Sequence, residues 1–149
     1  MPVTVFTDGL CQPKNPGGVA IYAFIVSKDN KKFYQESGLA AEPYSEGATN
    51  NVAEYTAVVK AIEYLKSKGL HNEDITLYSD SKLVIEQLNG NYKVKSANIS
   101  SMYKKIKTMF FGFSSLKFVW VPREENKEAD RLTKIGYNEF LKSRMESSE

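Results

Sequence analysis

Four carboxylates in this sequence stand where packing alone does not explain a charged side chain. Asp8 and Asp80 follow short apolar runs, in VFTDG and LYSDS, and each precedes a small residue. Glu54 falls on the apolar face of a helix predicted over residues 50–68, and Asp130 lies at the margin of the inner face of a later helix. Carboxylates that share a site repel one another, and proteins stabilise such a group mainly by binding a hard cation. The pattern therefore indicates a divalent metal site.

Each carboxylate taken alone also has a purely structural explanation. Asp-Gly and Ser-Asp-Ser are common in turns and helix caps, so Asp8 and Asp80 could serve only the backbone. Glu54 could accept hydrogen bonds at the start of its own helix, where the helix dipole favours a negative charge. Asp130 fits a solvated charge in the first turn of a helix. A metal site accounts for the four positions together.

Hydrophobic periodicity predicts the elements that must bring these side chains together. A first strand is expected over residues 3–8, ending at Asp8, and the turn-rich stretch GLCQPKNPGG is expected to break it. Residues 19–40 are typical of a hairpin that turns at KDNK. Further strands are predicted over 74–80 and 116–121, and helices over 50–68, 81–88, 97–111 and 126–144, the last capped by Asn126. This order predicts an α/β fold with a mixed sheet of five strands.

Length and composition fit one globular domain. The chain has 149 residues, of which 42% are hydrophobic and 26% charged, with a net charge of +2. Its one cysteine, Cys11, allows no internal disulfide and is typical of a reducing compartment. Neither a membrane-spanning run nor a signal peptide is recognisable. We expect a cytoplasmic protein with one domain over residues 1–141, a frayed tail over 142–149, no membrane attachment and no obligate protein partner.

Four sequence blocks, in this order, resemble the type 1 ribonucleases H. The blocks are TDG…NPGG (Thr7 to Gly18), TNNVAEYTAV (Thr49 to Val58), YSDSKLVIEQL (Tyr78 to Leu88) and VWVPREENKEADRL (Val119 to Leu132). The resemblance implies a ribonuclease H-like fold, with the first three strands antiparallel and helices packed on both faces of the sheet. It also implies endonucleolytic cleavage of the RNA strand of RNA/DNA hybrids, leaving 5′-phosphate and 3′-hydroxyl ends.

The resemblance also assigns roles residue by residue. The family's catalytic carboxylates, which hold two Mg²⁺ ions that Mn²⁺ can replace, match Asp8, Glu54, Asp80 and Asp130. The positions that contact nucleic acid match Asn15, Thr49, Asn50 and Asn51. Amides and hydroxyls suit this role because they donate hydrogen bonds to phosphates and 2′-hydroxyl groups. One residue of the Thr-Asn-Asn stretch is also expected to cap the helix that follows.

The chain departs from the family pattern after the third carboxylate's helix. Many members carry a basic, aromatic-rich protrusion there, whereas here only NGNYKVKS separates two helices. Lys93 and Lys95, with Lys104, Lys105 and Lys107 in the next helix, form a modest basic cluster. This cluster suits phosphate contacts, or is simply a solvated surface. We expect the hold on substrate to be weaker or more salt-sensitive than in members with the protrusion.

A second departure lies between the last strand and Asp130. Many members carry a mobile histidine in this loop, whereas this chain has Arg123 and Glu124, and its only histidine, His71, is expected on the surface far from Asp80. Arginine cannot act as a general base, but it can contact a phosphate or developing negative charge. We predict that Arg123 supplies the electrostatic part of the missing histidine's role. The alternative is a salt bridge to a neighbouring glutamate.

Two other classes of protein compete with a nuclease. A non-catalytic nucleic-acid-binding module would gain nothing from four carboxylates that face phosphates. A phosphoacceptor signalling domain would need an adjacent acidic pair after the first strand, where this chain has TDG. The sequence leaves open whether double-stranded RNA is also a substrate, and it fixes neither the preferred metal, the cleavage-site preference nor the oligomeric state.

Overall fold

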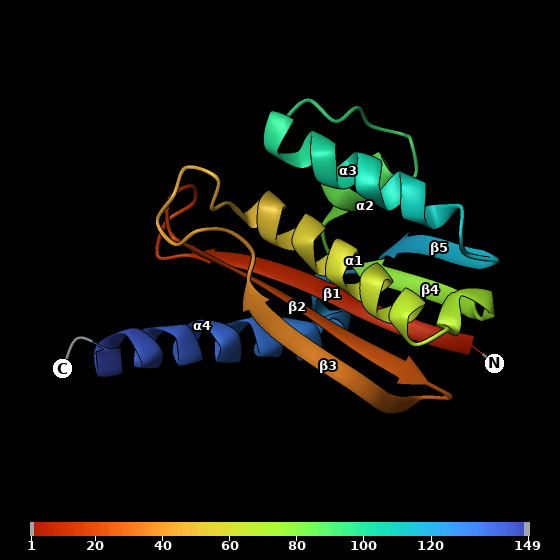
Figure 1. Ribbon diagram of the computed structural model, residues 1–149, viewed down its shortest axis with the longest axis horizontal. Helices are drawn as coiled ribbons and strands as arrows, with labels where there is room; N and C mark the ends of the chain where they lie inside the picture. The colour runs from red at the N-terminus through yellow and green to blue at the C-terminus, as the bar shows by residue number, and fades with distance from the viewer. Residues whose placement is uncertain (1, 148–149) are drawn as a thin grey trace.

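A five-stranded mixed sheet forms the centre of the structure, a computed structural model that describes residues 2–147 (Figure 1). Its strands are β1 (Pro2–Gln12), β2 (Val19–Lys28), β3 (Lys31–Leu39), β4 (Asp74–Ser79) and β5 (Ser115–Trp120). The strand order is β3-β2-β1-β4-β5. The first three strands pair antiparallel, while β4 is parallel to both β1 and β5. The predicted fold class is therefore confirmed.

Helices cover both faces of this sheet (Figure 1). Helices α1 (Asn50–Ser67), α2 (Lys82–Leu88) and α3 (Ala97–Phe110) lie on one side, and α4 (Lys127–Ser147) lies on the other. Alternate side chains of β2 serve the two faces: Phe24 packs in the core beneath α1, whereas Ile25 packs against Leu132 of α4. Short 3-10 turns span Leu70–Asn72 and Arg123–Glu125.

Strand β1 is longer than predicted. It continues past Asp8 to Gln12, so the prediction that Asp8 ends its strand is wrong. Gly9 does not break the strand, because pairing with β2 extends to the Gln12–Val19 pair. A glycine is required there by α1 instead, since a Cβ on Gly9 would lie 2.5 Å from the Glu54 backbone nitrogen. Helix α1 therefore crosses β1 in backbone contact beside Asp8.

We expect Gly9→Ala to lower the free energy of unfolding by about 1–3 kcal/mol, because the new methyl group meets backbone that cannot move aside. Urea unfolding measures this loss. Gly47→Ala is the matched control, since its Cβ would have no neighbour closer than 3.9 Å. The control should change stability by no more than about 0.5 kcal/mol. Equal stability of the two variants would contradict the close approach of α1 to β1.

The last helix also exceeds its prediction. Helix α4 ends at Ser147, beyond both the helix end predicted at 144 and the domain boundary expected at 141. Residues 148–149 of the expected frayed tail lie outside the described residues. Within residues 2–147, no helix has the length and apolar character needed to cross a membrane.

Candidate active site

Strands β1 and β4 are parallel neighbours and set Asp8 beside Asp80. Thr7 lies opposite Ser79, and the Thr7 hydroxyl donates to the Tyr78 carbonyl at 3.0 Å. Asp8 follows Thr7, and Asp80 follows Ser79, in the same strand direction. Because β4 ends at Ser79 while β1 continues, Asp8 is held within a strand and Asp80 stands in the bend before α2. The parallel pairing of these two strands therefore places the two aspartates next to each other.

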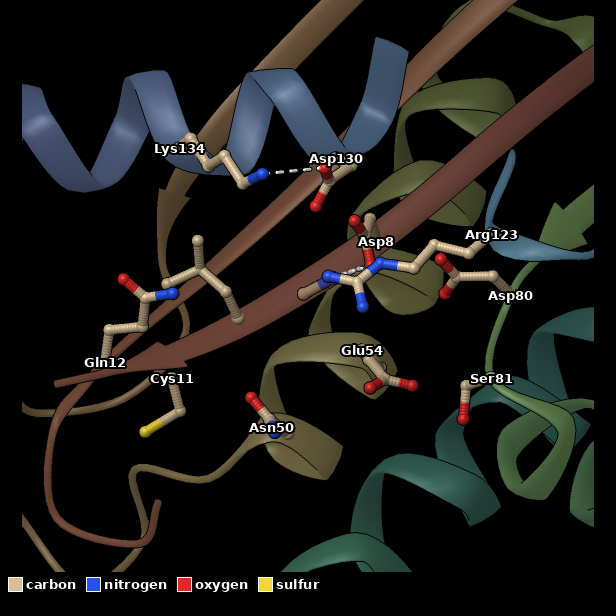
Figure 2. Close-up of a pocket in the computed structure, with 12 residues that line it drawn as sticks. Asp8, Cys11, Gln12, Asn50, Glu54, Asp80, Ser81, Arg123, Asp130 and Lys134 are labelled. Atoms are coloured by element: carbon tan, nitrogen blue, oxygen red, sulfur yellow. Dashed lines mark hydrogen bonds and ion pairs between the residues drawn. The ribbon is translucent and has the colours of Figure 1, made fainter. Parts of the chain in front are cut away.

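Glu54 and Asp130 approach the same place from helices on opposite faces of the sheet (Figure 2). One open cavity of about 400 Å³ is lined by Asp8, Glu54, Asp80 and Asp130, and also by Asn50, Ser81, Arg123 and Lys134. The Oε2 atom of Glu54 is buried and has no hydrogen-bond partner among residues 2–147. A carboxylate oxygen of Asp130 lies 3.1 Å from Lys134 Nζ. The structure thus brings the four predicted carboxylates together.

Burial raises the pKa of two of these carboxyl groups to near neutral. For Asp8, burial and then the nearby Asp80 carboxylate raise the pKa to about 8, although the Gly9 N–H, which donates to Asp8 at 2.9 Å, opposes the rise. For Glu54, burial raises the pKa to about 7, against the opposing effect of a hydrogen bond from Ser81. Without a cation, the cavity therefore favours bound protons over its full negative charge.

Asp80 has two partners that favour its charged form. Burial raises the pKa of Asp80, whereas the Asn126 amide and the Arg123 guanidinium act in the opposite direction. Arg123 comes from the 3-10 turn after β5, and its side chain extends into the space between the carboxylates (Figure 2). The neighbouring Glu124 and Glu125 line a different hollow, on the side of Phe6 and Ile25. This geometry favours an interaction of Arg123 with the cavity.

Asn126 stands at the N-cap position of α4, but its side chain does not cap the helix. The Asn126 carbonyl accepts the Asp130 N–H at 3.1 Å, the first hydrogen bond of the helix. Its side-chain Nδ2 donates instead to the Thr7 carbonyl at 2.9 Å, in the middle of the sheet. The expected capping by this side chain is therefore wrong. The buried amide joins the loop to β1 and supports Asp80, a role that the sequence did not reveal.

The donor set suits a hard divalent cation. Carboxylate oxygens are the ligands that Mg²⁺ prefers, and the unpartnered Oε2 of Glu54 is a buried oxygen that a cation would satisfy. Across residues 2–147, no three His, Cys, Asp or Glu side chains lie close enough to enclose an ion by themselves. Mg²⁺ needs few protein ligands, because it retains waters and takes substrate phosphate oxygens. The carboxylates therefore fit an ion whose coordination a substrate would complete.

The polar residues predicted to bind nucleic acid gather at the start of α1. The Thr49 hydroxyl accepts the Val52 N–H at 3.0 Å, so this residue caps the helix as expected. The Asn15 side-chain oxygen accepts the Asn50 N–H at 3.1 Å, which leaves the exposed Asn15 amide nitrogen as a donor. Asn50 lines the cavity, and Asn51 is exposed next to it. Asn50 therefore lies at the cavity, and the other three polar residues lie beside it at the start of α1.

The predicted basic cluster is divided by the structure. Lys105 forms an ion pair with Glu63 at 2.9 Å, and Lys107 Nζ donates at 2.6 Å to a backbone carbonyl at the end of α2. These two lysines therefore fasten α3 to its neighbours. Lys93 and Lys95 are exposed in the segment between α2 and α3 and do not line the cavity. They remain the candidates for phosphate contacts.

The single histidine lies away from the cavity. His71 belongs to the 3-10 turn before β4, at the opposite end of that strand from Asp80, as expected. It is half-buried rather than fully exposed, and its backbone carbonyl accepts the Ser114 N–H at 2.9 Å. His71 therefore belongs to the packing around the start of β4 and takes no part in the cavity.

The sheet order and the acidic cavity on its central strand define a ribonuclease H-like domain. A family model described as reverse transcriptase-like matches residues 7–136. The chain therefore belongs to the reverse transcriptase-like family, and its fold is ribonuclease H-like.

Relatives of known sequence agree with this assignment. The chain is 33% identical over 132 residues to the bifunctional protein Rv2228c of Mycobacterium tuberculosis, a match that covers 89% of this chain and 34% of the relative. It is also 33% identical over 132 residues to ribonuclease HI of Halobacterium salinarum, covering 87% of this chain and 61% of that protein. The chain thus spans about a third of the length of its mycobacterial relative.

Solved structures show the same fold. LC11-RNase H1 in complex with an RNA/DNA hybrid superimposes with a TM-score of 0.82 at 28% identity, covering 93% of this chain and 99% of the other. The N-terminal RNase H domain of Rv2228c from Mycobacterium tuberculosis gives a TM-score of 0.82 at 27% identity, covering 96% and 98%. The fold of the whole described sheet is therefore shared with type 1 ribonucleases H.

Proposed function

We propose that this chain is a divalent-metal-dependent endoribonuclease that hydrolyses the RNA strand of RNA/DNA hybrids and leaves 5′-phosphate and 3′-hydroxyl ends. One observation carries the proposal: four carboxylates from two parallel strands and two opposed helices converge on one open cavity. A cavity of such charge would repel phosphate unless cations were bound in it. The relationship to LC11-RNase H1, whose structure holds an RNA/DNA hybrid, supports the choice of substrate.

The chain's own groups divide the work between holding cations and holding substrate. Asp8 and Asp80 would hold the ions from the sheet, with Glu54 and Asp130 completing the ligand set from the two helices. Two bound Mg²⁺ ions, or Mn²⁺ in their place, would supply an activated water and neutralise charge on the departing 3′-oxygen. The donors at the start of α1 would bind the sugar-phosphate backbone, and Arg123 would face the scissile phosphate.

Arg123→Ala tests the part assigned to the guanidinium. We expect kcat/KM on a hybrid to fall by roughly 10- to 100-fold, since the variant loses a charged donor directed at developing negative charge. Arg123→Lys should recover part of the loss, because it keeps the charge without the planar fork. Arg131→Ala, at an exposed position of α4, is the control and should behave as wild type. Unchanged kcat and KM in Arg123→Ala would refute the role.

The activity itself is tested with labelled RNA/DNA, RNA/RNA and DNA/DNA duplexes, each incubated with Mg²⁺, Mn²⁺ or chelator. We expect cleavage of the RNA strand of the hybrid with either metal and none in chelator. Binding of the hybrid without metal-dependent cleavage would instead identify a non-catalytic binding module. The RNA/RNA arm decides whether double-stranded RNA is a second substrate.

A further inference from the structure

Gln87 forms a buried hydrogen-bonded link between α1 and the segment over residues 90–96. Its Oε1 accepts the Tyr55 hydroxyl at 2.7 Å, and its Nε2 donates to the Lys93 backbone carbonyl at 3.2 Å. Tyr55 is 1% exposed and Gln87 is 8% exposed. Because both ends of the amide are engaged, its orientation is fixed, and the backbone at Lys93 is joined to the helix that carries Glu54.

The rest of the segment is also fastened to the fold. The N–H groups of Asn91 and Tyr92 both donate to the Glu86 carbonyl, at 2.8 and 3.2 Å. Val94 is half-buried and packs against the main core, whereas Lys93 and Lys95 on either side of it are exposed. The two lysine side chains therefore face solvent, while buried contacts of Val94 and Gln87 hold the backbone between them. The segment is short, but it has the contacts of an ordered element.

Helix packing brings this segment to the same end of the molecule as the acidic cavity. Thr56 Oγ1 lies 3.6 Å from Met102 Sδ, and farther along both helices Lys105 Nζ lies 2.9 Å from a Glu63 carboxylate oxygen. Helices α1 and α3 therefore run parallel, and the start of α3 lies over the start of α1 (Figure 1). The end of the segment that leads into α3 therefore lies over the start of α1, which is the end of that helix that carries Glu54.

We propose that Gln87 is a positioning residue that holds Lys93 and Lys95 as a preformed phosphate-binding segment at a fixed place relative to the acidic cavity. The inference rests on the proposed function and deepens it, since the ligand is the phosphate backbone of the substrate duplex. Binding to a preordered segment avoids the entropy cost of ordering it with each substrate. Gln87 therefore acts on substrate affinity, through Lys93, and leaves the chemical step alone.

Gln87→Met tests this role, because methionine has a similar length and forms neither hydrogen bond. We expect KM for a hybrid to rise about 3- to 10-fold with kcat within about twofold of wild type, and the amides of residues 91–96 to exchange hydrogen faster. Asn89→Ala is the matched control. It removes a bond from Asn89 Nδ2 to the Phe118 carbonyl, 3.1 Å long, at the end of the same helix. Equal rises of KM in the two variants would show a general loosening of α2 and overturn the proposal.

A double-mutant cycle then tests whether Gln87 acts through the lysines. In a Lys93→Ala/Lys95→Ala background, Gln87→Met should raise KM no further, whereas a full additional rise would overturn the proposal.

Hybrid affinity measured by fluorescence anisotropy in chelator separates binding from cleavage. If wild type binds the hybrid but does not cut it, the proposed catalysis fails, and Kd replaces KM in the same comparisons. If wild type neither binds nor cuts, both fail; if wild type cuts and Gln87→Met leaves KM and Kd unchanged, only the Gln87 inference is overturned.

Discussion

Asp80→Asn should lower kcat for hybrid cleavage by roughly a thousandfold or more, which corresponds to about 4 kcal/mol of lost transition-state stabilisation. Asparagine keeps the size of the side chain but not the negative charge that would hold a cation. The Asp80 backbone carbonyl accepts the Trp120 Nε1–H at 3.1 Å, a contact that the variant retains. Removing one of several mutually repelling carboxylates should leave the fold at least as stable as before.

Single-turnover cleavage in Mg²⁺ and a thermal melt followed by circular dichroism measure the two halves of this expectation. Asp74→Asn is the control, because it makes the same change at the exposed opposite end of β4. The control should cleave the hybrid as wild type does. Substantial activity in Asp80→Asn, with the fold intact, would refute the assignment of the cavity as the active site.

In the presence of chelator, the melting temperature should fall as the pH rises from about 4 to about 8. The pKa of Asp8 is about 8 in the folded chain, against an ordinary value of 3.8, and the pKa of Glu54 shifts in the same direction, from 4.5 to about 7. Between these limits the folded chain holds protons that the unfolded chain has lost, so rising pH favours unfolding. Above the folded pKa values both states are deprotonated and the decline levels off.

Differential scanning fluorimetry across this pH range measures the effect, which we expect to be roughly 5–10 °C. Saturating Mg²⁺ should restore stability at the alkaline end, because a bound cation takes the place of the protons. Asp8→Asn should flatten the profile, while Asp74→Asn should keep the wild-type profile. A wild-type melting temperature that stayed level or rose with pH in chelator would contradict the burial of these charges.

The elements of the fold were largely predictable, because each buries a face whose residues recur at a regular spacing. Helix α1 ends where expected, before Gly69, whose φ of +69° favours glycine. The length of β1 was not predictable from local signals. Gly9 has the appearance of a strand end, and only the partner strand β2, which pairs as far as Val19, shows that the strand continues. Pairing between segments decides such boundaries, and a single run of residues does not contain that information.

The candidate site divides in the same way. The four carboxylates could be predicted because together they suit one cation site, and because Glu54 is a charge on an apolar helix face. Asn126 and Gln87 conflict with nothing nearby. Their partners, Thr7 and Tyr55, lie 119 and 32 residues away along the chain. An amide that joins distant segments is recognisable only when the segments have been placed in space.

The continuation of β1 beyond Asp8 has a consequence for heat inactivation. Asp8 lies within the central strand, which is bounded by β2 and β4, so its backbone opens only when the sheet itself opens. Asp130 lies in the first turn of a helix and Asp80 in a bend, where local opening needs far less free energy. Moderate heating would therefore displace Asp80 and Asp130 first, while Asp8 stays in place in the sheet. A preparation inactivated in this way would recover on cooling, because the central strand that carries Asp8 would have stayed paired in the sheet.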